Sequence, residues 1–163
     1  MGGTGEPASG RPVTSGRVLY GADDLVAQWV ARHIPGFQAS PGAKALGVFD
    51  GKRIVAGVVF ERWNGVHAEV SIAAEPGSRW ADRSTLFRLF DYPFRQLDCQ
   101  ALTVVVPQSN LPSLNLATKL GFRPEAIIAF AAHDGGPLIV LKMFREQCRW
   151  INDGQGKQRA AAA

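Results

Sequence analysis

The chain has 163 residues, of which 46% are hydrophobic and 20% are charged. This length suits one domain with a sizeable core, and the composition is ordinary for a soluble globular protein. No apolar run approaches the length of a membrane-spanning helix, so a membrane protein is not expected. The net charge is +4, but basic and aromatic residues do not interleave on one evident face, which argues against nucleic-acid binding.

The two ends of the sequence differ in composition from its centre. Residues 1–15 are rich in Gly, Ser, Thr and Pro, and residues 152–163 have a similar character. Such segments predict disordered tails around a folded domain at residues 16–151. The first residues lack the basic and apolar regions of a signal peptide, and the two cysteines have no metal-ligand spacing. We therefore expect a cytoplasmic protein with free thiols and no metal site.

Hydrophobic spacing and turn signals predict the elements of the first half of the domain. They are a short strand at 17–20, a helix from Asp23 or Asp24 to His33, and strands at 46–49, 54–63 and 66–74. Asp-Gly and Asn-Gly pairs separate the three later strands and favour antiparallel hairpins. In the last of these strands, His67 and Glu69 share one face, and a run of apolar side chains occupies the other.

The second half begins with a helix at 81–96 that carries a dense apolar stripe, in which Pro93 should kink the helix or loosen its last turn. A β-branched run at 102–106 predicts a buried strand. The short helix that follows is bounded by Asn110, a good N-cap, and by Gly121, which suits a left-handed C-terminal residue.

Two closing strands, at 126–131 and 138–143, flank a turn and form a hairpin. The whole order is strand, helix, three antiparallel strands, helix, strand, helix and two strands. It predicts a mixed α/β domain with a mostly antiparallel sheet and crossover helices.

The most specific motif of the sequence runs from Asn110 to Glu125 and reads Asn-x-x-Ser-(x)4-Thr-Lys-Leu-Gly-Phe-x-x-Glu. It resembles the late motif of the GNAT N-acetyltransferases, although a strand-helix unit whose Gly and Phe serve only as cap and core is the plain alternative. Further pieces follow the family's order, and within the family they are most similar to short phage- and prophage-borne members. These pieces are Gly57-Val-Val-Phe60, Trp80-Ala-Asp-Arg83, Asp91-Tyr-Pro-Phe94 and Cys148-Arg-Trp150.

The resemblance implies the GNAT fold over about residues 18–150 and the transfer of an acetyl group from acetyl-CoA to an amine, directly in a ternary complex. In this family the pantetheine arm of the coenzyme lies beside the third antiparallel strand, which splays from its neighbour. By resemblance, the residues that hold the arm are Ala73, Ala74, Glu75, Asn110 and Ser113.

The coenzyme's pyrophosphate is expected at the start of the helix that follows that strand, because helix N-termini present free N–H groups. The matching segment is Ser78, Arg79, Trp80, Ala81, Asp82, Arg83, Ser84 and Thr85. Where the family commonly has glycines, this segment has none after Gly77, and Asp82 adds an unfavourable charge. Arg79 and Arg83 could compensate with charge-assisted contacts from one side of the helix start, if the segment is helical.

Glu69 is the first candidate for the general base, because Ala68-Glu69-Val70 resembles the Ala-Glu-Ile of histone-type acetyltransferases. Partial burial could raise the pKa of such a carboxylate toward the working pH. His67 is the second candidate, and Glu61 on the preceding strand is the third. The alternative is that Glu69 and His67 simply decorate a solvent-facing side of the sheet.

Two functions stay open on the sequence alone. The first is an acetyl-CoA-dependent N-acetyltransferase whose acceptor, a small molecule or a protein bearing an amine, binds near residues 34–43. The second is a non-catalytic GNAT-fold protein that modulates a partner with or without CoA. The loop without glycines favours the second, and so does Ala117, which stands where the family often has a tyrosine. Either protein would be a monomer or a homodimer, without a membrane partner.

Overall fold

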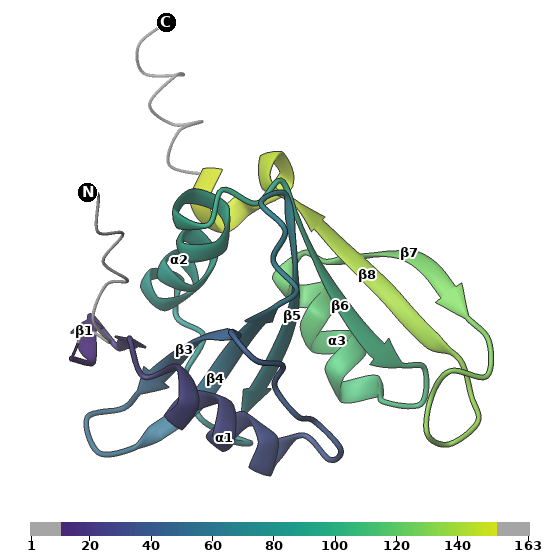
Figure 1. Ribbon diagram of the computed structural model, residues 1–163, viewed down its shortest axis with the longest axis horizontal. Coiled ribbons are helices and arrows are strands. Elements are labelled where there is room, and N and C mark those ends of the chain that lie inside the picture. The colour runs from purple at the N-terminus through teal and green to yellow at the C-terminus, as the bar shows by residue number, and fades with distance from the viewer. Residues whose placement is uncertain (1–10, 153–163) are drawn as a thin grey trace, which may run out of the picture.

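The computed structural model describes residues 11–152, which form one eight-stranded sheet with helices on both of its faces (Figure 1). The strands are β1 (Val13–Ser15), β2 (Val18–Tyr20), β3 (Lys44–Phe49), β4 (Ile54–Glu61), β5 (His67–Ala74), β6 (Ala101–Pro107), β7 (Arg123–Ile128) and β8 (Leu138–Phe144). The helices are α1 (Asp23–His33), α2 (Arg83–Asp91), a π-helical turn (Tyr92–Gln96), α3 (Leu111–Leu120) and a 3₁₀ turn (Arg145–Gln147). Within residues 11–152, no helix is long and apolar enough to cross a membrane.

The sheet has the order β1-β2-β3-β4-β5-β6-β8-β7, and every neighbouring pair is antiparallel except β5 and β6. The mixed, mostly antiparallel sheet expected from the sequence is thus confirmed. The ends of the strands from β3 onward differ from the expected ones by at most three residues. Such shifts are normal where a strand frays into a turn.

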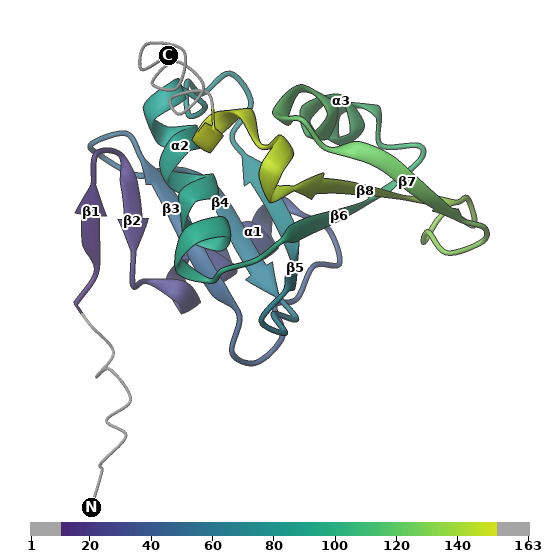
Figure 2. The same cartoon turned by 90° about the horizontal axis from the view of Figure 1, so that it is seen from above.

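Two apolar cores hold the helices against the sheet. On one face, α2 and α3 pack on the central strands around Phe94, Leu102 and Leu141, all of which are fully buried. On the other face, α1 packs through Val26 and Val30, and Figure 2 shows it on the side of the sheet opposite α2. Gly57 in β4 makes this contact possible, because a Cβ there would lie only 2.7 Å from Cγ2 of Val30.

The strand β1 lies within the segment that was expected to be a tail. Val13–Ser15 pairs with β2 through a turn at Gly16, whose φ of 56° suits glycine. All three side chains of β1 are exposed, so the strand has no apolar alternation that would reveal it in the sequence. Residues 1–10 and 153–163, where the rest of the expected tails falls, lie outside the described residues.

The helix expected at 81–96 is a shorter α-helix followed by a π-helical turn. Asp82 is the N-cap, so α2 begins two residues later than expected. Pro93 has no N–H to donate, and its ring disfavours regular α-helical geometry. The chain therefore forms a hydrogen bond of the i→i+5 type, in which the Leu97 N–H donates to the Tyr92 carbonyl at 3.0 Å.

The parallel contact between β5 and β6 is short, as the resemblance implied. Pairing joins His67 to Ala101, Ala68 to Leu102 and Glu69 to Thr103, and then stops. Beyond these pairs the two strands diverge and form a fork, with α3 between their separated ends in the view of Figure 1. The last residues of β5 therefore have a strand neighbour on the β4 side only.

Candidate functional site

A row of polar side chains crosses the sheet at the apex of the fork. Glu61 of β4 pairs with Glu69 of β5, Glu69 with Thr103 of β6, and Thr103 with Lys142 of β8. Side chains alternate along a strand, so Glu69 lies on the same face as Ala73, which packs beneath α1. The row therefore lies on the α1 face of the sheet, where β5 and β6 begin to separate.

Glu69, the first candidate for the base, is partly exposed at this apex. Its side chain is 32% exposed, and its Oε2 accepts a hydrogen bond from Nη1 of Arg62 at 2.7 Å. The carboxylate is thus held by a cation at the end of β4. It lies directly beside the paired residue of β6, which is where β5 loses its neighbour.

His67 lies next to Glu69 on the same face and is hydrogen-bonded across the fork. Its Nε2 is 2.5 Å from Oγ1 of Thr103, a hydroxyl on a residue that is only 9% exposed. Burial lowers the pKa of His67, and the charge of Lys142 lowers it further, while Glu69 and Glu125 partly offset this effect. The lowered pKa favours the neutral imidazole, whose unprotonated nitrogen can accept a proton.

Glu61, the third candidate, is committed to a structural contact. It is only 5% exposed, and its Oε2 accepts the backbone N–H of Ser40 at 2.7 Å. Ser40 belongs to the 34–43 segment that we expected near the acceptor. The buried carboxylate thus fastens this segment beside the polar row.

The backbone of β5 offers hydrogen-bonding groups to the interior of the fork. Glu75 donates its N–H to the Val55 carbonyl of β4 at 2.8 Å, so by the alternation of an antiparallel ladder Ala73 also faces β4. The N–H and C=O groups of Ala74 and Ile72 point to the opposite side, toward the fork. Of the three strand residues named from the resemblance, Ala74 is the one whose backbone faces the fork.

The start of α3 closes the β6 side of the fork with a neutral cap. Asn110 accepts the N–H of Ser113 through its Oδ1 at 3.3 Å, and Gly121 ends the helix with a φ of 110°. Both expected caps are thus present. Asn110 is exposed and Ser113 is partly exposed, so their side chains lie near the surface.

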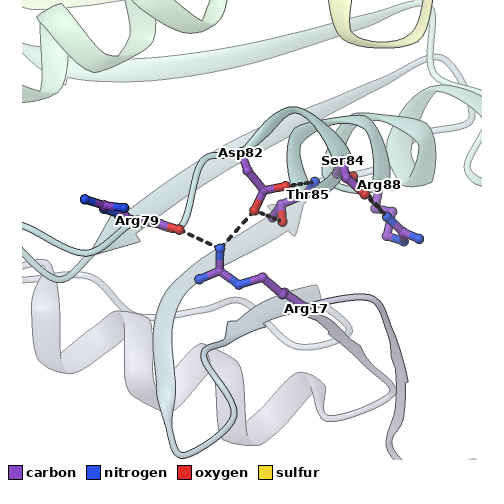
Figure 3. A network of polar contacts seen from close by, with 6 residues as sticks. All are labelled: Arg17, Arg79, Asp82, Ser84, Thr85 and Arg88. Atoms are coloured by element: carbon purple, nitrogen blue, oxygen red, sulfur yellow. Dashed lines mark hydrogen bonds and ion pairs between the residues drawn. The ribbon is translucent and has the colours of Figure 1, made fainter.

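The start of α2 carries a charged cap held in a network of polar contacts (Figure 3). Asp82 accepts the N–H of Thr85 at 2.9 Å and the Thr85 hydroxyl at 2.8 Å. Nη1 of Arg17 donates to the same carboxylate at 2.9 Å and to the Arg79 carbonyl at 2.6 Å. Burial opposes ionisation of Asp82, but the hydrogen bonds from Thr85 and Arg17 prevail and lower its pKa.

The remaining residues of the 78–85 segment do not gather around a common point. The Ser78 hydroxyl donates to the Glu75 carbonyl at 2.7 Å, and the Ser84 hydroxyl accepts a hydrogen bond from Arg88. Trp80 is 7% exposed and packs in the core, whereas Ala81 is exposed.

The two arginines expected to reach a phosphate do not share a helix. Arg79 precedes the first residue of α2, Arg83, by four positions in non-helical chain, so the i to i+4 spacing on one helix side is wrong. The guanidinium of Arg79 points away from Asp82 in Figure 3. The Asp82 cap explains the difference, because a capping residue with extended backbone fixes where the helix can begin.

No protein-family model matches this sequence, and no curated protein matches it either. Solved structures do match. A protein named only by its expected class, an acetyltransferase, has a TM-score of 0.66 and 14% identity over 88% of this chain and 94% of its own. A variant of the spermidine N-acetyltransferase SpeG from Vibrio cholerae has a TM-score of 0.58 and 19% identity over 83% of this chain and 80% of its own. The N-acetyltransferase PseH from Campylobacter jejuni, in complex with acetyl coenzyme A, has a TM-score of 0.50 and 18% identity over 65% of this chain and 70% of its own.

The chain has the GNAT N-acetyltransferase fold. At these identities the likeness establishes the fold, and the chemistry has to be argued from the site. Within the GNAT fold, the fork and the row of polar side chains at its apex are the features that can serve acyl transfer. The charged cap of α2 is a feature that opposes the binding of an anion.

Four residues of the site were missed by the sequence analysis: Arg17, Arg62, Thr103 and Lys142. Thr103 and Lys142 each interrupt an otherwise apolar strand, which was a usable signal. Arg17 and Arg62 had none, because their partners are set by how the chain folds back on itself.

Proposed function

We propose that this chain is an N-acetyltransferase that transfers the acetyl group of acetyl-CoA to an amine. The observation that carries the proposal is the fork between β5 and β6, whose apex holds Glu69 beside His67 and Thr103. Where the two strands separate, β5 has backbone N–H and C=O groups that face no neighbouring strand. An imidazole and a carboxylate, both possible proton acceptors, lie beside these groups. The order of motifs is our reason to expect a relative of the short phage-borne members of the fold.

The fork suits the pantetheine end of the coenzyme. The arm contains amide groups, and the backbone of Ile72 and Ala74 presents N–H and C=O groups toward the fork. When bound, the coenzyme supplies the acetyl group as a thioester. The N-terminus of α2 does not suit the phosphate end, because the carboxylate of Asp82 already takes the Thr85 N–H.

The groups at the apex give the acceptor what it needs. An amine attacks only in its neutral form, so a proton has to leave it. We assign Glu69 as the acceptor of this proton, directly or through a water molecule, and His67 is the alternative acceptor. Direct transfer in a ternary complex is the mechanism that we propose, with the amine itself attacking the thioester and the thiol of CoA leaving.

The acceptor is an amine-bearing small molecule or protein. Glu69 is the partly exposed carboxylate at the apex, and a protonated amine would compete with Arg62 for it. Spermidine is the substrate named for SpeG, and it belongs to this chemical class. The 34–43 segment, fastened by Glu61 to Ser40, would border the acceptor.

The test is acetyl transfer to a panel of amines, measured in the parent and in Glu69→Gln and His67→Gln. Glu69→Gln should lower kcat by about 100-fold, the usual contribution of a general base, with little change in coenzyme affinity. If His67→Gln shows the larger loss and Glu69→Gln retains activity, the role of base passes to His67. The absence of transfer to every amine, together with no binding of acetyl-CoA by calorimetry, would contradict the proposal.

A second function, a GNAT-fold protein that binds a partner and catalyses nothing, is favoured by one observation. The Asp82–Arg17 pair occupies the helix start that would otherwise meet the coenzyme's phosphates. The acetyl-transfer assay separates the two functions, because the binding protein would transfer no acetyl group whether or not it binds acetyl-CoA.

A further inference from the structure

The carboxylate of Asp82 is already bound at the N-terminus of α2. A helix N-terminus attracts a phosphate through unsatisfied N–H groups and a partial positive charge. Here the carboxylate of Asp82 takes the Thr85 N–H at 2.9 Å and the Thr85 hydroxyl at 2.8 Å. A diphosphate at the same place would have to displace a bound carboxylate and then remain beside its negative charge.

A positive charge beside the Asp82 carboxylate is also engaged. Nη1 of Arg17 lies 2.9 Å from Oδ2 of Asp82, and it donates to the Arg79 carbonyl as well. This pair ties the turn between β1 and β2 to the loop before α2, 65 residues later in the chain. Arg17 is therefore already engaged with Asp82 and with the Arg79 carbonyl.

The loop before α2 is anchored and has little room to rearrange. Trp80 is 7% exposed and belongs to the core on the α2 face. With Phe90 and Leu120 it helps to line a hollow of about 10 Å³, room for one water molecule at most. The buried indole anchors the backbone two residues before the capping carboxylate.

We propose that this chain recognises its acyl donor through the pantetheine arm at the fork, and that Asp82 excludes the diphosphate from the start of α2. The inference rests on the proposed function, because it assumes a thioester donor. It assigns Asp82 as a residue that determines donor specificity. The preferred donor class is then any acyl-pantetheine thioester, and the nucleotide of CoA adds little to affinity.

The first test compares two donors on the parent protein by calorimetry: acetyl-CoA and S-acetylpantetheine, which lacks the diphosphate and the nucleotide. We expect dissociation constants within about fivefold of each other, a difference of about 1 kcal/mol. The affinity for acetyl-CoA should also depend weakly on salt, since few phosphate charges are contacted. An acetyl-CoA affinity about 50-fold or more above that of S-acetylpantetheine would overturn the inference.

The second test removes the charge and keeps the cap. Asn is as good an N-cap as Asp, so Asp82→Asn should fold and retain the bond from Thr85. We expect this variant to bind acetyl-CoA at least about fivefold tighter than the parent, while S-acetylpantetheine changes by less than about twofold. An unchanged acetyl-CoA affinity would show that the carboxylate does not exclude the diphosphate.

A matched control makes the same change of charge away from α2. Glu146 is an exposed residue on the 3₁₀ turn after β8, and Glu146→Gln should leave both affinities as in the parent. Binding of neither donor, to the parent or to Asp82→Asn, would overturn the proposed function together with the inference. Strong binding of acetyl-CoA alone would overturn the inference and leave the proposed function standing.

Discussion

Two helices, α2 and α3, begin just beyond the two arms of the fork, and the same local rule starts both of them. Asp82 accepts the N–H of Thr85, and Asn110 accepts the N–H of Ser113. The α2 cap is charged, 2.9 Å from its donor and backed by Arg17, whereas the α3 cap is neutral and 3.3 Å from its donor.

The difference shows that a capping rule alone does not decide what a helix N-terminus can bind. Both caps satisfy an N–H group that the helix leaves without a partner. Only at α2 does the cap also bring a negative charge, and only there does a distant cation hold it in place. The electrostatics of a site can thus be set by residues far away in the sequence, even when the local structure is the same.

The largest effect should come from removing the anchor of the α2 loop. Trp80→Ala should lower the free energy of unfolding by about 3–5 kcal/mol, because it empties a buried aromatic site. The matched change in α3 is Leu111→Ala, at a side chain that is 63% exposed, and it should cost less than about 0.5 kcal/mol. Urea unfolding measures both, and similar losses would mean that the two helix starts are anchored alike.

The second effect is the loss of the charged cap. Asp82→Ala should cost about 2 kcal/mol, because it removes the cap, breaks the contact with Arg17 and leaves the Thr85 hydroxyl without its acceptor at a residue only 2% exposed. Thermal unfolding followed by circular dichroism checks this. Asp82→Asn, which keeps the cap, should recover most of the loss.

The third effect concerns how the stability of the fold depends on pH in acid. The pKa of Asp82 is lower in the folded protein than its ordinary value of 3.8, so ionised Asp82 stabilises the fold above that value. This contribution is lost as the pH falls below about 4, through the lowered pKa. Asp82→Asn should therefore reduce the loss of stability between pH 5 and 2, measured by urea unfolding at several pH values. Equal acid sensitivity in the variant and the parent would contradict the role given to the Arg17 contact.

The smallest effect should come from the neutral cap. Asn110→Ala should cost about 0.5–1 kcal/mol, the low end for an N-cap, because its bond is long and exposed to water. The same urea titration measures it. A cost equal to that of Asp82→Ala would remove the contrast between the two helices.

The sequence analysis located what local chemistry determines. Asn110 and Gly121 bound α3 as expected, since caps and left-handed glycines act within a few residues. The start of α2 was misplaced, although Asp82 is a good N-cap by the same rule. The apolar stripe of the helix extends to Ala81, whereas the carboxylate of Asp82 sets the boundary by capping the first turn.

Long-range features were out of reach for physical reasons. The pair between Arg17 and Asp82 depends on β1 and β2 lying at the edge of the sheet near α2. The bond between His67 and Thr103 depends on strand register, which pairs residues 36 positions apart. The sequence shows that these polar residues are present, but it does not show which residue each of them contacts.

The fork also determines where the sheet can deform. The sheet has two antiparallel parts, β1 to β5 and β6 to β8, and in the described residues three pairs of the β5–β6 ladder join them. Within the two parts, β4 with β5 and β6 with β8 form longer antiparallel ladders, whereas the junction between the parts carries few backbone bonds. Opening the fork would therefore break few backbone bonds, and the apolar core that α2 shares with both parts of the sheet would be the main resistance to it.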